Sequence, residues 1–92
     1  MGARTMSELE SARRELLQGA PTGKILGAMA LLEVKGWAGL ARDERRVWGW
    51  MVSELDRRAE AMHGFDAYWA MDPKEGEGSV AFYSRVLGEV PA

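Results

Sequence analysis

With 92 residues and no cysteine, the chain has the length of one small domain, and it excludes disulfides, thiolate nucleophiles and cysteine-based zinc sites. Its formal charge of −2 gives no general attraction to nucleic acid or anionic membranes, and its composition, 47% hydrophobic and 28% charged, is typical of a chain that folds. We therefore expect one domain over residues 1–92, with residues 1–5 as a flexible leader before Met6.

The sequence predicts a cytoplasmic protein without a membrane-spanning segment. Its most apolar segment, residues 25–32, is eight residues long, whereas a membrane helix needs roughly 20. No N-terminal segment combines basic residues with an apolar run as long as that of a secretion signal. Nine arginines against three lysines, together with the absence of asparagine, suggest a high-GC bacterial genome or a phage of such a host.

The first predicted helix covers residues 7–19. Ser7 and Glu10 have the spacing of a capping box, in which each side chain bonds the backbone amide of the other residue. One face of this helix is apolar, through Met6, Leu9, Ala12, Leu16 and Leu17. Gly19 followed by Pro21 is the expected stop, because glycine accepts the left-handed cap and proline cannot continue the hydrogen-bond ladder.

A second helix is predicted from Thr22, whose side chain can cap it, to about Gly36 or Gly39. It is apolar nearly all round, which is typical of a helix at the centre of a domain. The residues responsible include Ile25, Leu26, Met29, Leu32, Val34 and Trp37. Gly27 and Gly36 each weaken a helix by roughly 1 kcal/mol relative to alanine. Either neighbouring backbones approach closely at these two positions, or the glycines have no particular role.

The longest periodic run, residues 39–64, predicts the third helix. Asp43 and Glu44 lie in its first turn, where carboxylates complement the helix dipole. Glu54 and Arg58 have the i, i+4 order that stabilises a helix. The apolar stripe spans an arc of about 140°, the width of a core-facing surface. Its members are Val47, Trp48, Met51, Val52, Leu55, Ala59 and Met62.

After the third helix the pattern is less regular. Residues 65–71 are consistent with one or two helical turns, and residues 72–78 with a loop, since a proline and two glycines interrupt them. Residues 79–90 fit either a helix capped by Ser79 or an alternating strand, and we choose the helix because a single strand would have no partner.

The predicted fold is all-α, a compact bundle of three main helices plus a short C-terminal helical element. The second helix is expected to be central. Five side chains are expected to be buried in the core, namely Leu26, Leu32, Trp37, Trp48 and Leu55.

Trp50 lies two residues after a tryptophan of the core stripe and therefore points about 200° away from it. The charged residues on its side of the helix are Arg46, Glu54 and Arg57. One interpretation is that residues 65–71 or the C-terminal segment cover the ring. We choose the other interpretation, in which Trp50 anchors a protein partner or a second copy of the chain, because tryptophan and arginine are enriched at binding hot spots.

Catalytic and metal-binding signatures are missing from the sequence. His63 is the only histidine, and neither a nucleophile elbow nor a glycine-rich phosphate loop accompanies it. The acidic residues Asp66, Asp72, Glu75 and Glu77 depart from the EF-hand pattern and lack its closing glutamate. We expect a non-enzymatic protein without a cofactor or metal.

The predicted function is a small protein-binding module, an adaptor, regulator or inhibitor of a larger bacterial protein, which binds a protein partner or forms a homodimer. The alternative is a helix-turn-helix DNA-binding regulator, with Arg42, Arg45 and Arg46 at the start of the recognition helix. Asp43 and Glu44 lie among these arginines, where phosphates would approach. Because these carboxylates would repel phosphate, we favour a protein partner over nucleic acid.

Overall fold

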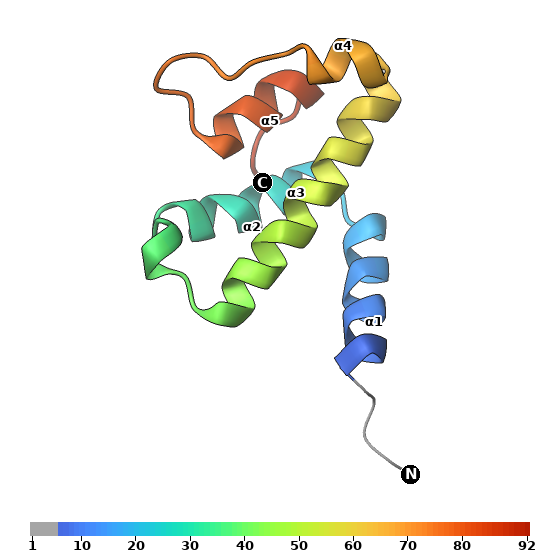
Figure 1. Ribbon diagram of the computed structural model, residues 1–92, viewed down its shortest axis with the longest axis vertical. Coiled ribbons are helices and arrows are strands. Elements are labelled where there is room, and N and C mark those ends of the chain that lie inside the picture. The colour runs from blue at the N-terminus through green and yellow to red at the C-terminus, as the bar shows by residue number, and fades with distance from the viewer. Residues whose placement is uncertain (1–5) are drawn as a thin grey trace.

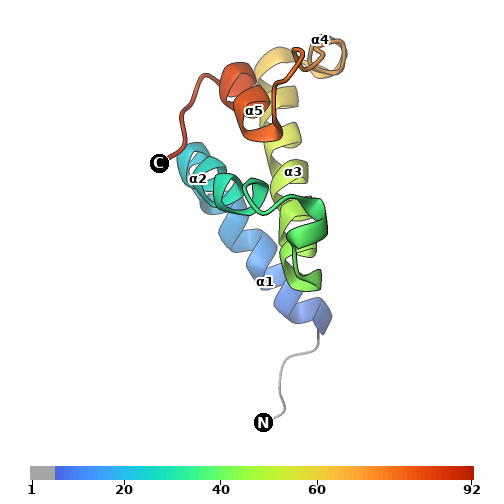
Figure 2. The ribbon, with the colours of Figure 1, turned by 90° about the vertical axis from the view of Figure 1, so that its left-hand side faces the viewer.

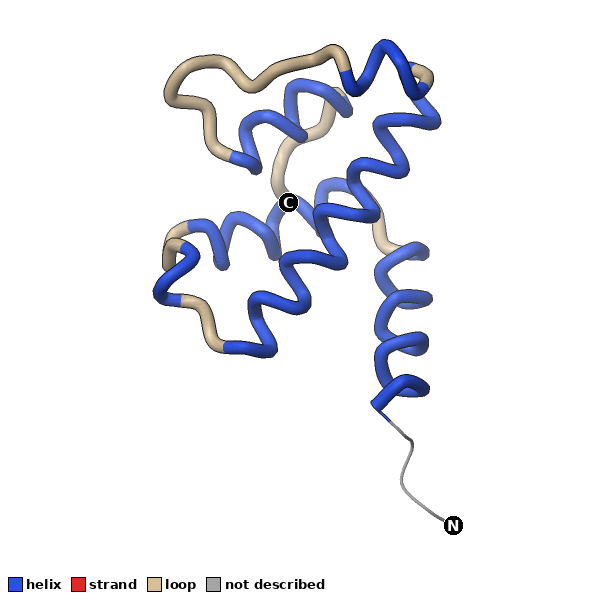
Figure 3. Tube along the Cα trace, in the orientation of Figure 1, coloured by secondary structure: helices blue, strands red, loops and turns tan. Residues whose placement is uncertain are grey.

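The computed structural model describes residues 6–92, which form five α-helices and one 3-10 turn. The helices are α1 (Met6–Gly19), α2 (Thr22–Glu33), α3 (Arg42–His63), α4 (Phe65–Trp69) and α5 (Ser79–Leu87), and the 3-10 turn η1 covers Trp37–Gly39. Over this range there is no strand, and loops only join the helices (Figure 3). The all-α prediction is confirmed, including the choice of helix in the C-terminal segment.

The central element is α3, which runs diagonally between α1 on one side and α2 and α5 on the other (Figure 1). Its 22 residues span about 33 Å, which is enough to contact every other α-helix. The prediction that the second helix is central is wrong. It ends at Glu33 and buries one face, whereas Leu31 and Val34 on its other side are 73% and 89% exposed.

The main core lies between α2, α3 and α5, with α4 closing one end. Its buried side chains are Ile25, Leu26, Met29, Met51, Leu55, Ala59, Tyr68, Val80, Tyr83, Val86 and Leu87. Leu26 and Leu55 are fully buried, as predicted. Trp48 and Leu32 are only half-buried and pack against the edge of this cluster.

Trp37 is 60% exposed, so the prediction that it belongs to the core is wrong. The second helix ends before it, because Gly36 takes a φ of +70° that an α-helix does not accommodate. Open space surrounds Gly36, so this conformation, not a close backbone approach, explains the glycine. The guanidinium of Arg45 lies 5.0 Å from the Trp37 ring centroid and donates to its carbonyl at 3.0 and 3.2 Å.

The end of the chain returns along α2, where two glycines make room for it (Figure 2). The Ala92 amide donates to the Gly23 carbonyl at 2.9 Å. A Cβ at Gly27 would collide with the Ala92 carbonyl oxygen, and one at Gly23 would lie 3.0 Å from that of Val90. The close backbone approach predicted as one explanation for Gly27 is therefore present.

The start of α5 is stabilised by a distant side chain, and that of α3 by a local one, because the Ala41 amide donates to Glu44 at 2.8 Å. Neither Thr22 nor Ser79 is the residue before its helix, and the predicted side-chain caps at these two positions are wrong. Instead, the Ser79 amide donates to the Glu33 carboxylate at 2.7 Å, which joins the end of α2 to the start of α5. The predicted capping box involves Ser7, whose side chain lies outside the described residues.

One arginine of α3, Arg58, fixes the corner between α1 and α2. Its guanidinium donates to the carbonyl oxygens of Leu17, Gln18 and Ala20, to the hydroxyl of Thr22 and to the carboxylate of Glu54. The carbonyls belong to the last turn of α1 and the link after it, where a helix has no internal donors left. The Glu54–Arg58 pair predicted from the sequence is present, at 2.6 Å.

Replacing Leu55 with alanine should lower the free energy of unfolding by about 2–5 kcal/mol, because the substitution leaves a cavity in a fully buried site. Urea denaturation measures the change. Leu31→Ala is the matched control, since Leu31 is 73% exposed, and should cost less than about 0.5 kcal/mol. Equal losses at the two positions would contradict the proposed core.

Adjacent arginines on α3 give a second comparison, because Arg57 and Arg58 bind the same carboxylate of Glu54. Arg58 is 16% exposed and holds three backbone carbonyls, so Arg58→Ala should cost about 1–3 kcal/mol. Arg57 is 58% exposed, so Arg57→Ala should cost less than about 1 kcal/mol. Thermal and urea unfolding of both variants would test this order, and the reverse order would refute it.

Candidate functional site

Trp50 lies beneath α1 and is only 8% exposed. The ring is separate from the main core cluster, as its direction on the helix predicted, and the guanidinium of Arg14 in α1 lies 6.0 Å from its centroid. The prediction that another molecule supplies its apolar surface is therefore wrong for this ring. A segment of the same chain covers Trp50, but that segment is α1 and not residues 65–71 or the C-terminal segment.

Of the charged residues predicted around Trp50, Arg46 contacts α1, whereas Glu54 and Arg57 are paired within α3. Arg46 pairs with Glu10 at 3.2 Å. Glu54 is 5% exposed, and hydrogen bonds from Arg57, and then from Arg58, lower its pKa. Arg57 is the most exposed of this group, and its contact with a partner stays a prediction.

Two of the three arginines of the DNA-binding alternative have partners within the chain. Arg45 is bound to the carbonyl and ring of Trp37, and Arg46 is paired with Glu10. Glu44 accepts hydrogen bonds from Lys35 and from the Ala41 amide, and these lower its pKa. A negative charge thus stays in the first turn of α3, where a phosphate would have to approach.

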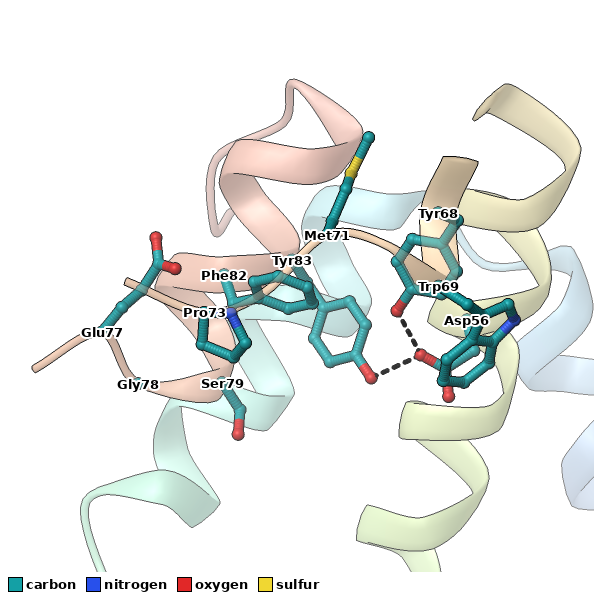
Figure 4. A pocket seen from close by; sticks show the side chains of 10 residues that line it. All are labelled: Asp56, Tyr68, Trp69, Met71, Pro73, Glu77, Gly78, Ser79, Phe82 and Tyr83. Atoms are coloured by element: carbon teal, nitrogen blue, oxygen red, sulfur yellow. Dashed lines mark hydrogen bonds between the residues drawn. The ribbon is translucent and has the colours of Figure 1, made fainter. Parts of the chain in front are cut away.

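A cavity of about 330 Å³ lies between α3, α4 and α5, and four of the ten residues that line it are aromatic (Figure 4). Its lining includes Asp56 from α3, Tyr68 and Trp69 from α4, and Phe82 and Tyr83 from α5. The two tyrosine hydroxyls point toward one carboxylate oxygen, Oδ1 of Asp56, and donate to it at 2.5 Å and 2.7 Å. Three helices that meet at the core therefore converge on one carboxylate.

The two tyrosines remain hydrogen-bond donors over the whole physiological pH range. Burial raises the pKa of both Tyr68 and Tyr83 well above its usual value, and the hydrogen bond to Asp56 raises each further. Asp56 is half-buried, and no lysine or arginine among the described residues forms an ion pair with it. The cavity consequently carries a negative charge that the chain does not neutralise.

The loop before α5 forms the rim of this cavity and is held by Arg85. The guanidinium donates to both carboxylate oxygens of Glu77, each at 2.9 Å, and to the Asp72 carbonyl at 3.2 Å. It also lies 5.4 Å from the Phe82 ring centroid. The hydrogen bonds from Arg85, and then that from the Lys74 amide, lower the pKa of Glu77 to about 2.

Beside the cavity, two aromatic side chains of α4 face solvent. Phe65 is 65% exposed and Trp69 is 53% exposed, and their ring centroids are 6.2 Å apart. The Trp69 indole nitrogen donates to Glu60 at 2.7 Å, which fixes the orientation of that ring. We call this pair the aromatic corner. Sequence reasoning missed it, although five of the eight aromatic residues lie between residues 65 and 83.

Other candidate chemistry has structural explanations. His63 Nε2 lies 2.7 Å from the Val86 carbonyl oxygen, so it ties the end of α3 to α5. Within residues 6–92, histidine and carboxylate side chains form no group able to hold a metal ion. No helix in this part of the chain is long and apolar enough to cross a bilayer.

Comparison with known proteins gives no further guide, because no family model, curated protein or solved structure matches the chain. The cavity and the aromatic corner therefore have to be interpreted from their own residues. Together they combine two exposed rings with a carboxylate that has no ion pair with a described lysine or arginine. Among the surfaces described above, this one is the most suited to binding a ligand.

Acid should weaken the link between Glu77 and Arg85. A carboxyl group whose pKa falls on folding, here from 4.5 to about 2, stabilises the fold above pH 4.5 and loses that contribution as pH falls toward 2. Glu77→Gln should therefore be less stable than wild type at pH 6, and the difference should shrink between pH 4.5 and pH 2. Urea unfolding at a series of pH values measures it.

Glu75→Gln is the control, because Glu75 is exposed in the same loop. Its effect on the free energy of unfolding at pH 6 should be smaller than that of Glu77→Gln. A Glu77→Gln difference that is equally large at pH 6 and at pH 2.5 would contradict the role assigned to this carboxylate.

Proposed function

We propose that the protein is a small non-enzymatic protein-binding module, an adaptor, regulator or inhibitor, that binds a short basic segment of a partner protein. The binding surface comprises the aromatic corner and the rim of the neighbouring cavity. The observation that carries this proposal is the pair of exposed rings, Phe65 and Trp69, next to a cavity with an unpaired carboxylate.

The apolar part of the proposal rests on the cost of exposing aromatic surface. Phe65 and Trp69 leave more than half of their surface in water although they lie in contact range of one another. Aromatic residues are enriched at binding hot spots, and a ring that is already held in place loses little entropy on binding. The hydrogen bond from Trp69 to Glu60 holds one of the two rings.

The charge of the surrounding segment determines the chemistry of the partner. Residues 59–85 carry five carboxylates and two basic residues, Lys74 and Arg85, although the whole chain has a net charge of only −2. These carboxylates are Glu60, Asp66, Asp72, Glu75 and Glu77. Complementary potentials steer association and suppress wrong partners, so a basic segment fits this surface and a phosphate backbone does not.

This surface replaces the Trp50 face as the site of binding. The Trp50 ring is covered by α1, whereas the aromatic corner is open to solvent. The kind of function that we propose stays the same as predicted from the sequence, because the described residues offer rings and charges for an interface. The proposed location of the binding surface and the expected charge of the partner differ from the prediction made from the sequence.

Selection from a random peptide display library tests the proposal. We expect the selected peptides to carry arginine or lysine next to leucine, phenylalanine or tryptophan. Phe65→Ser should lower the affinity for such a peptide tenfold or more, since it removes a ring at the proposed contact. Calorimetry measures the affinity, which should also fall as salt is raised.

Leu31→Ser is the matched control, because Leu31 is similarly exposed but lies on α2. It should leave the affinity within twofold of wild type, and melting curves should show that both variants fold. The proposal fails if the selected peptides lack basic residues, or if Phe65→Ser does not lower the affinity for them. Salt-sensitive binding of duplex DNA that is abolished by Arg42→Ala with Arg45→Ala would support the DNA-binding alternative in its place.

A further inference from the structure

We propose that the cavity lined by Asp56, Tyr68, Trp69, Phe82 and Tyr83 binds a methylated ammonium cation. The class includes the head of a methylated lysine side chain and small quaternary ammonium compounds. Where the cation belongs to a partner's side chain, this inference rests on the proposed function. The cavity would then receive one side chain of the basic segment that lies on the aromatic corner.

The aromatic rings form a continuous series along the cavity. The ring centroid of Tyr68 lies 5.0 Å from that of Trp69 and 6.4 Å from that of Phe82, and the centroids of Phe82 and Tyr83 are 5.5 Å apart. These rings come from two helices that the sequence separates by a loop, and they meet only in the fold. All four rings line the cavity, and aromatic rings attract quaternary ammonium groups through their negative faces.

The carboxylate of Asp56 determines the sign of the ligand's charge. Both tyrosine hydroxyls donate to its Oδ1 atom, so their protons are already used and are not free to bind an anion. Among the described residues nothing is hydrogen-bonded to Oδ2, and no cation of the chain is paired with Asp56. A half-buried charge without a partner favours a cationic ligand, since the attraction is less screened there than in water.

The arginine on the rim of the cavity does not occupy the site. Arg85 lies over the Phe82 ring but is held by Glu77 and by the Asp72 carbonyl, and it is not among the residues that line the cavity. A volume of about 330 Å³ is at the low end of the range for small-molecule sites, which suits the head of one side chain. The cavity adjoins the aromatic corner, because Trp69 belongs to both.

Titration with choline, followed by NMR of the ¹⁵N-labelled protein, tests the inference. Choline should shift the indole N–H signal of Trp69 and the amide signals around Tyr68 and Tyr83 in a saturable way. Its neutral isostere, 3,3-dimethylbutan-1-ol, should bind at least tenfold more weakly, because it has the same shape without the charge. Equal binding of the two compounds, or no shift with choline, would overturn the proposal without the need for any variant.

Asp56→Asn gives a second test, because the amide keeps the size and an acceptor for the tyrosine hydroxyls but removes the charge. Choline affinity should fall at least tenfold. Asp43→Asn is the control, since Asp43 is exposed in the first turn of α3 and does not line the cavity, and it should change the affinity less than twofold. An unchanged affinity in Asp56→Asn would overturn the assignment of this carboxylate.

A selected basic peptide then distinguishes the source of the cation. A peptide with one trimethylated lysine that binds at least tenfold tighter than its unmethylated form would support a partner's side chain as the ligand. Choline binding without such a preference supports a free ammonium compound. If choline binds and no peptide does, the proposed function fails and this inference stands. If peptides bind and choline does not, this inference fails and the proposed function stands.

Discussion

The fold depends on α3 having three surfaces that face different parts of the chain. At about 100° per residue, Leu55 points into the main core, Glu54 lies about 100° to one side of it and Asp56 about 100° to the other. The first surface packs against α2 and α5, the second holds α1, and the third lines the cavity with α4 and α5. Three consecutive residues therefore belong to the core, to a helix contact and to a candidate binding site.

The two acidic residues of this triplet show how the same chemical group takes different roles. Glu54 is almost fully buried and is bound by two arginines, so its charge is used within the chain. Asp56 is bound by two tyrosine hydroxyls, which orient the carboxylate but leave its charge uncompensated. A carboxylate that is oriented without being neutralised is available to a ligand, and this difference is the physical basis of the proposed site.

Much of the fold was predictable because it depends on local patterns. The apolar stripe identified α3, a proline and glycines marked the loops, and the direction of Trp50 away from the main core followed from helix geometry alone. Helix geometry gives the direction of a side chain but not what lies opposite it, so the cover supplied by α1 was missed. The exposure of Trp37 was missed for a related reason, because a single φ of +70° at Gly36 ended α2 early.

The candidate site depended on contacts that sequence patterns do not reveal. Asp56 is 12 residues from Tyr68 and 27 from Tyr83, and the three side chains meet only in the folded chain. The concentration of aromatic residues after residue 64 was the available signal. It indicates an aromatic surface but does not show that the rings surround a carboxylate.

The most direct test of the account is to locate a bound basic peptide on the protein. A peptide with a nitroxide spin label broadens the amide signals of nearby residues in NMR spectra. The account predicts broadening in α4 and in the first turn of α5, with the signals of residues 11–19 in α1 unchanged. Broadening confined to α1 and the neighbouring turns of α3 would contradict it, and would place binding at the Trp50 face.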